Sequence, residues 1–222
     1  MKATDTYRAE IARATTYKLL AECYYPPTER LLQDVKELGR CLEMMGSAAS
    51  EAVDRMGVAV QGAEGFEELA IDHSRLFVGP FALLAPPFGS VYLERERRLM
   101  ADSTQAVDRC YREAGLELAE GFNGTPDHIA AELEFMHVLV IQALDALTQG
   151  ELDCARRCDQ KQGSFLERHL AAWVPEFSRS VEEHAGTRFY QGLAAATRMF
   201  IQGELDQTRS DLPAPVRGSV SA

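Results

Sequence analysis

Apolar residues recur at steps of three and four along most of the chain, the pattern of amphipathic α-helices. The clearest case follows Pro126, which opens a predicted helix with Asp127 in its first turn, where a carboxylate suits the helix dipole. No period-two alternation of useful length is found, so the sequence predicts an all-α fold. The helix after Pro126 is expected to bury a continuous stripe made of Ile129, Leu133, Met136, Val140, Leu144 and Leu147.

The other helices are predicted from the same spacing and from the breaks between them. The first helix is expected to stop at the YYPP stretch of residues 24–27, and Pro175 is expected to separate two later helices. Residues 1–205 are predicted to form a single helical-bundle domain, and residues 206–222, which have little to bury, a flexible C-terminal tail. The expected helical ranges are 6–25, 28–45, 47–60, 66–77, 92–114, 151–173, 175–186 and 187–203.

Residues 79–91 interrupt the helical pattern with an apolar, proline-rich segment. Three prolines and two glycines between residues 79 and 89 exclude a regular helix there, yet the segment is aromatic rather than polar, which is unusual for a loop. We expect it either to be buried or to present an apolar surface to a partner. The residues that would supply this surface are Leu76, Phe77, Pro86, Pro87 and Phe88, with Asp127 and His128 as a polar edge. The alternative is that Pro87 and Phe88 only fill the helical core.

Composition and charge exclude several classes of function. Of the 222 residues, 46% are hydrophobic and 26% charged, the balance of an ordinary globular protein. The net charge of −11 does not suit a phosphate backbone, so we expect no nucleic-acid partner. No apolar run approaches the roughly 18–20 residues that cross a bilayer, and the N-terminus lacks the pattern of a secretory signal. Five cysteines at irregular spacings indicate reduced thiols and a cytoplasmic location.

The acidic and histidine residues near the strongest helix do not predict a metal site. Glu134 and His137 form one Glu-x-x-His pair, whereas a di-iron bundle needs two such pairs, so we expect Glu134 to be solvated and His137 to flank the core. His128 and Glu132 lie on the opposite flank of the helix and supply too few ligands for a closed zinc site.

Signatures of catalysis are also missing from the chain. There is no nucleophile elbow, phosphate-binding loop or dinucleotide fingerprint, and Cys154 and Cys158 are spaced as helical cysteines rather than as a metal-binding pair. We therefore predict no catalytic, cofactor-binding or metal-binding residue. A metal-dependent enzyme that uses Asp127, His128 and Glu132 remains an alternative.

Three stretches together resemble one known family. They are RLFVGP…LLAPPFGSVYLERE, then PDHIAAELEFM, and then FLERHLAAWVPEF, and the resemblance to the TorD/DmsD family of redox-enzyme maturation chaperones runs from about residue 70 to 200. It implies an all-helical cytoplasmic chaperone that binds the twin-arginine leader, and the apo-form, of a molybdoenzyme catalytic subunit. Such a protein assists insertion of the molybdenum cofactor and delays export until folding is complete.

The resemblance carries over to specific positions. The family's Leu-Phe, Pro-aromatic and Asp-His pairs fall on Leu76 and Phe77, Pro87 and Phe88, and Asp127 and His128. The family loop commonly reads Glu-Pro-x-Asp-His, whereas this chain has GTPDH, with Gly124 in place of the glutamate. We hypothesise that the apolar residues take the apolar part of a leader while Asp127 pairs with an arginine, and that Glu94 and Glu96 steer the leader from a distance.

Several alternatives remain open at this level. The client is not named, and reductases of dimethyl sulfoxide, trimethylamine oxide or selenate all fit the resemblance. The chain could instead be a helical scaffold that binds the mature part of a cytoplasmic-facing oxidoreductase subunit. The loop 117–126 contains two glycines and could act as a hinge, so the protein is expected to be a monomer or a domain-swapped dimer without stable membrane insertion.

Overall fold

The computed structural model describes residues 3–61, 65–79, 83–94, 102–119, 122 and 124–211. Within these residues all regular structure is helical, which confirms the predicted all-α fold. The helices are α1 (Ala3–Cys23), α2 (Leu31–Met45), α3 (Ser50–Gln61), α4 (Phe66–His73), α5 (Gly89–Leu93), α6 (Asp102–Glu113), α7 (Ile129–Thr148), α8 (Leu152–Phe165), α9 (Ala171–His184) and α10 (Arg188–Asp211). Two π-helical turns, η1 (Ser74–Val78) and η2 (Leu166–Leu170), continue α4 and α8.

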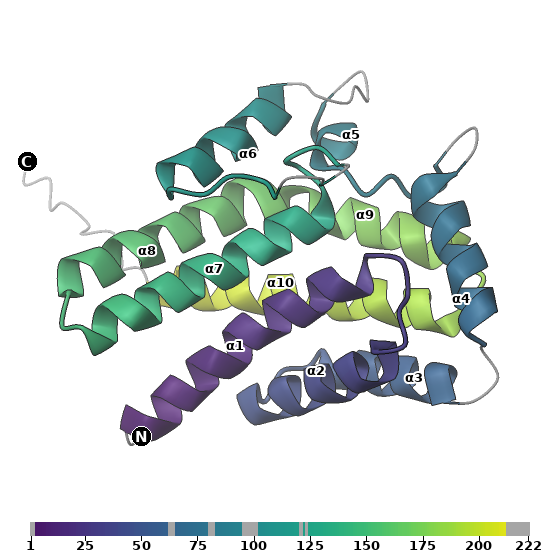
Figure 1. The fold of residues 1–222 in the computed structure, drawn as a ribbon, viewed down its shortest axis with the longest axis horizontal. Helices are drawn as coiled ribbons and strands as arrows, with labels where there is room; N and C mark the ends of the chain where they lie inside the picture. Colours follow the sequence, from purple (N-terminus) through teal and green to yellow (C-terminus); the bar gives the residue numbers. More distant parts are fainter. Residues whose placement is uncertain are drawn as a thin grey trace, which may run out of the picture.

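The helices surround a core that α1, α7 and α10 share. In Figure 1, α7 and α8 lie on one side of this core, α2 and α3 lie on the other, and α5 and α6 lie across the α7–α9 layer. α1 and α7 run side by side in opposite directions (Figure 1), and the His137 Nδ1 atom of α7 lies 2.8 Å from the Ala14 carbonyl oxygen of α1. The long N-terminal helix is therefore a central element of the fold.

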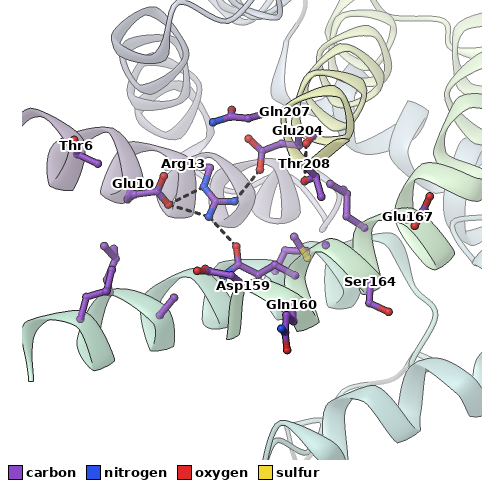
Figure 2. A pocket seen from close by; sticks show the side chains of 17 residues that line it. Thr6, Glu10, Arg13, Asp159, Gln160, Ser164, Glu167, Glu204, Gln207 and Thr208 are labelled. Atoms are coloured by element: carbon purple, nitrogen blue, oxygen red, sulfur yellow. Dashed lines mark hydrogen bonds and ion pairs between the residues drawn. The ribbon is translucent and has the colours of Figure 1, made fainter. Parts of the chain in front are cut away.

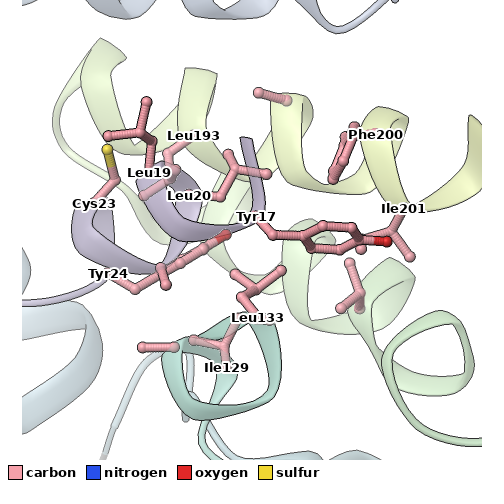
Figure 3. Packing of buried hydrophobic residues seen from close by; sticks show 14 of the residues in the cluster. Tyr17, Leu19, Leu20, Cys23, Tyr24, Ile129, Leu133, Leu193, Phe200 and Ile201 are labelled. Carbon is pink, nitrogen blue, oxygen red and sulfur yellow. The ribbon is translucent and has the colours of Figure 1, made fainter. Parts of the chain in front are cut away.

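Each half of α1 is held by a different kind of contact. In its N-terminal half, the Arg13 guanidinium donates hydrogen bonds to Glu10, Gln162 and Glu204, which ties α1 to α8 and α10 (Figure 2). Beyond Arg13, its buried apolar and aromatic side chains pack between α7 and α10 (Figure 3). There the ring centroids of Tyr17 and Phe200 are 4.8 Å apart. Burial of these large side chains is the main stabilising term in such a bundle.

Asp72 of α4 fixes the start of α10. Its buried carboxylate accepts hydrogen bonds from the Thr187 backbone N–H at 2.9 Å, the Thr187 hydroxyl at 2.8 Å and the Gly186 N–H at 3.2 Å. It also pairs with Arg75 at 2.7 Å. An acid from a distant helix thus satisfies backbone donors that the first turn of α10 leaves unpaired.

Several helix boundaries differ from the sequence prediction. Pro175 lies inside α9 rather than between helices, and the chain passes from α8 to α9 through η2. The predicted helix 92–114 is interrupted, because Glu94 has extended backbone angles and residues 95–101 lie outside the described part. α10 continues to Asp211, so residues 206–211 of the predicted tail are helical, while 212–222 are not described. α7 begins at Ile129, so Asp127 precedes its first turn.

The α7 stripe is confirmed except at its end. Its first five members are buried, but the side chain of Leu147 is 51% exposed. Gly150, at φ +76°, closes the helix two residues after Thr148, and the Glu151 N–H donates to the Ala146 carbonyl at 2.8 Å. Of the predicted hinge 117–126, residues 120, 121 and 123 lie outside the described part of the chain.

Candidate peptide-binding site

The structure joins the two segments that the sequence analysis singled out. Phe88 and His128, which are forty positions apart in the sequence, form an isolated antiparallel bridge. The Gly89 N–H donates to the Asp127 carbonyl and the Ile129 N–H donates to the Pro87 carbonyl, both at 2.9 Å. The proline-rich segment therefore lies directly on the N-terminal end of α7.

Asp127 fastens this junction from inside. Its side chain is 1% exposed, and Oδ2 accepts a hydrogen bond from the Ser90 backbone N–H in the first turn of α5 at 2.8 Å. The Tyr111 hydroxyl donates to the carbonyl of the preceding Pro126 at 2.7 Å. The expectation that Asp127 lies in the first turn of the helix after Pro126 is wrong, because α7 begins at Ile129 and the Asp127 carboxylate accepts a hydrogen bond from the first turn of α5 instead.

His128, the residue after Asp127, caps the first turn of α7. It is the N-cap of α7, and its Nδ1 atom accepts a hydrogen bond from the Ala130 N–H at 3.2 Å. Because Nδ1 acts as acceptor, the neutral ring carries its proton on Nε2. Burial lowers the pKa of His128 to about 4, and the neighbouring charge of Asp127 only partly opposes this shift.

Aromatic rings surround the His128 imidazole. The ring centroids of Phe88, Phe122 and Tyr25 lie 5.3, 5.9 and 6.3 Å from it. Phe88 and His128 are both half-buried, so each presents part of its ring to solvent. The result is a small, half-exposed aromatic surface around a neutral imidazole.

A layer beneath this surface was missed by the sequence analysis. Trp173 of α9 donates a hydrogen bond from Nε1 to Oε2 of the buried Glu132 at 3.1 Å. Burial raises the pKa of Glu132 well above its usual range, and Asp127 adds to that rise against the Trp173 hydrogen bond. A Cβ on Gly89 would lie 3.0 Å from the Trp173 Nε1 atom, so the segment packs tightly on the indole. The signal in the sequence is the single tryptophan of the chain, in the third stretch quoted for the resemblance.

Leu76 and Phe77 belong to the core rather than to a surface. Leu76 is fully buried, and the Phe77 ring packs against Tyr24, Phe177 and Tyr190 at centroid distances of 5.6–6.2 Å. The expectation that these two residues supply an exposed apolar surface is therefore corrected in this conformation. Among the proline-rich residues, Pro87 is buried whereas Pro86 is half-buried.

The side chains of the alternative metal site do not converge. Asp127, His128 and Glu132 are engaged by the Ser90 N–H, the Ala130 N–H and the Trp173 indole respectively. Across the described residues, no group of three or more His, Cys, Asp or Glu side chains is arranged to hold a metal ion.

The other acids singled out in the sequence have structural partners where they are described. Glu134 is half-buried and accepts a hydrogen bond from the Tyr25 hydroxyl at 3.1 Å, which corrects the expectation of a solvated side chain. Glu94 accepts a hydrogen bond from the Ser103 N–H at 3.2 Å, and Glu96 lies outside the described residues.

No helix in the described part of the chain is long and apolar enough to cross a membrane.

A family model and several known proteins match the part of the chain that contains this site. A family model described as nitrate reductase delta subunit matches residues 33–179, which contain all the residues of the junction. A Tat proofreading chaperone DmsD from Salmonella typhi is 36% identical over 150 residues, 68% of this chain and 65% of that protein. A chaperone protein TorD from Vibrio vulnificus (strain YJ016) is 28% identical over 141 residues, 62% of this chain and 63% of that protein. The chain thus spans just under two thirds of the length of these relatives.

A solved structure agrees with the fold. A proposed redox enzyme maturation protein from Archaeoglobus fulgidus superposes with a TM-score of 0.54 over 85% of this chain and 93% of that chain. The two sequences are 19% identical over this match, so the likeness concerns the helical architecture alone.

Proposed function

This chain belongs to the TorD/DmsD family of redox-enzyme maturation chaperones, within the nitrate reductase delta subunit family, and from that premise we propose that it binds the leader of a redox-enzyme precursor. In this proposal the partner is the twin-arginine leader, together with the apo-form, of a molybdenum-cofactor oxidoreductase. The chaperone acts in the cytoplasm, where it protects the leader until the cofactor is inserted. It works by binding and needs no catalytic residue.

The contact between Phe88 and His128 carries the proposal. It turns two distant stretches into one half-exposed aromatic surface, and apolar clusters with a few placed polar groups are typical of peptide-binding sites. A twin-arginine leader has a basic part followed by an apolar part. An aromatic surface suits the apolar part, and a protein of net charge −11 attracts the basic part.

The predicted site residues divide into two roles in this proposal. Phe88, His128 and Pro86 reach solvent and contact the leader. Leu76, Phe77, Pro87 and Asp127 hold those three in place, because all four are buried and Asp127 is bonded to the Ser90 N–H. The earlier hypothesis that Asp127 pairs with an arginine is thereby replaced by a positioning role.

Calorimetric titration with synthetic leader peptides from the molybdoenzymes of the source genome tests this function. We expect one leader to bind, its twin-lysine counterpart to bind more weakly, and Phe88→Ala to weaken binding roughly tenfold as an aromatic anchor would. Phe66→Ala is the matched control, because Phe66 is an exposed phenylalanine on α4 and its loss should leave affinity unchanged.

Other outcomes separate the alternatives. If no leader binds to the folded protein, the leader proposal is wrong. If the enzyme binds equally well after its leader is removed, the chain is a scaffold for the mature protein instead. If Phe66→Ala weakens binding as much as Phe88→Ala does, the leader does not dock on the Phe88–His128 surface.

A further inference from the structure

A second feature of the molecule lies in the other half of α7, away from the Phe88–His128 surface. There α1, α7, α8 and α10 enclose a cavity of about 670 Å³, within the range of ligand-sized pockets. Figure 2 shows acidic and amide side chains from these helices around it, with Arg13 between Glu10 and Glu204. None of the residues that line the cavity belongs to the proposed leader site.

The walls of this cavity carry an excess of negative charge. Among the described residues, four carboxylates and one guanidinium line it, so 1 − 4 gives a lining charge of −3 when all are ionised. Arg13 is used internally, because it bonds to Glu10 and Glu204 at 2.9 Å and to Gln162 at 2.7 Å. Burial alone would lower the pKa of Arg13, but Glu204, Tyr17 and Glu10 outweigh it and raise that pKa. The guanidinium therefore stays charged and holds two of the four acids.

The two remaining acids are placed at the exposed edge. Asp159 is exposed and accepts a long hydrogen bond of 3.4 Å from the Gln162 Nε2 atom, and Glu167 is 61% exposed with a long contact of 3.7 Å to the Arg209 guanidinium. Their charges stay accessible to a cation that enters from solvent. Even with Arg209 counted, the region keeps an excess of two negative charges.

Apolar side chains form the other part of the wall. Met136, Leu144 and Leu166 are buried, and Leu147 is half exposed. Leu147 was predicted as a core residue because it continues the core stripe of α7, but its side chain is 51% exposed. A leucine that lies beside accessible carboxylates suits a ligand that combines apolar and cationic groups.

We propose that this cavity is a second docking site, for a short partner segment that carries arginine or lysine beside leucine-sized apolar residues. The cation meets Asp159 and Glu167, and the apolar residue covers Leu147. Charge complementarity favours a polypeptide of this kind over an acidic or purely apolar one. The site is separate from the leader surface and does not depend on it.

The test uses a fluorescein-labelled synthetic peptide of arginine and leucine residues, with binding to the full chain followed by anisotropy. We expect the double variant Asp159→Asn, Glu167→Gln to weaken binding roughly tenfold and Leu147→Ser roughly fivefold. Peptides with glutamine in place of arginine, or serine in place of leucine, should bind more weakly than the parent. Affinity for the parent peptide should also fall as salt rises.

Matched controls are available on the same helices. Asp145→Asn with Glu151→Gln removes the same charge from exposed positions outside the cavity lining, and Leu152→Ser alters a leucine that is 55% exposed. These controls should bind like wild type. The proposal is overturned if wild type does not bind the peptide, if the serine peptide binds as well, or if the controls weaken binding equally. Loss of binding in Phe88→Ala would also overturn it, because the peptide would then occupy the leader surface.

Discussion

The two ends of α7 use carboxylates in opposite ways. At the N-terminal end, Asp127 and Glu132 are buried, and each accepts a hydrogen bond from within the protein. In the C-terminal half, Asp159 and Glu167 of the neighbouring helix segments reach solvent at the rim of a cavity. A buried, hydrogen-bonded carboxylate stabilises the fold, whereas a solvent-exposed carboxylate can bind a partner. The sequence shows the same residue types at both ends.

The largest effect is expected at the buried end, from Trp173→Ala. The variant removes a fully buried ring and the donor to Glu132, so the free energy of unfolding should fall by about 3–5 kcal/mol. Urea titration measures this loss. Trp173→Phe keeps most of the ring and should lose less, about 1–3 kcal/mol, from the unpaired carboxyl. A loss under about 1 kcal/mol in Trp173→Ala would mean that this layer does not hold the junction.

Arg13→Met should have the next largest effect. It tests how much the ion pairs of Arg13 with Glu10 and Glu204 stabilise the protein. It leaves Glu204 and Glu10 without their shared partner, so we expect a loss of roughly 3 kcal/mol in unfolding free energy. Arg8→Met, at an exposed position on the same helix, should change that energy by less than about 0.5 kcal/mol. Equal effects in the two variants would show that the Arg13 network does not stabilise α1.

The pH dependence of stability tests the neutral state of His128. Its pKa falls from 6.5 in the unfolded chain to about 4 in the folded one, so between these values the unfolded state binds more protons. Stability should therefore decrease as the pH falls from 6.5 towards 4, by at most about 1.4 kcal/mol per pH unit.

His128→Asn is the matched variant for this measurement, because asparagine also caps a helix and does not titrate. Urea titrations across this pH range should show a smaller slope for the variant. Glu132 contributes with the opposite sign, since its raised pKa makes stability fall as the pH rises above its unfolded value. The comparison is therefore made between wild type and the His128 variant at each pH. Parallel curves would contradict a buried neutral histidine.

The smallest effect on stability is expected from Glu167→Gln, at the solvent-exposed rim of the cavity. Its contact with Arg209 spans 3.7 Å between side chains that are more than half exposed, so the unfolding free energy should change by less than about 1 kcal/mol. Thermal unfolding at low and high salt provides the measurement. A loss comparable to that of Trp173→Ala would remove the distinction between the two ends.

The helical periodicity predicted the fold class and most of the core, because burial of one helix face imposes a repeat that apolar residues must follow. It failed where a neighbouring element decides exposure. Leu147 keeps the period, yet no helix in the described part of the chain covers it completely. A proline such as Pro175 usually indicates a helix break, yet Pro175 lies inside α9, which follows the π-helical turn η2.

The sequence grouped the residues of the candidate site but did not predict which of them are buried. Phe88 and His128 were grouped from the sequence, and the structure does bring them together. Leu76 and Phe77 were expected at the surface, but aromatic rings from the residue after α1, from α9 and from α10 enclose Phe77. Neither the role of Trp173 nor the burial of Glu132 could be predicted from neighbouring residues in the sequence. Both depend on how α9 packs against α7 and on the proline-rich segment, which lies about forty positions before Glu132.

The sequence by itself determined an all-helical chain, its main apolar stripe, its acidic charge and the residues of its two irregular segments. These follow from local geometry and composition, which each stretch of residues carries on its own. Only the tertiary structure decided which carboxylates are buried, whether His128 stays neutral and which apolar side chains are exposed to solvent. Those properties depend on what lies beside each side chain in space, and solvent access sets both the cost of a charge and its availability to a partner.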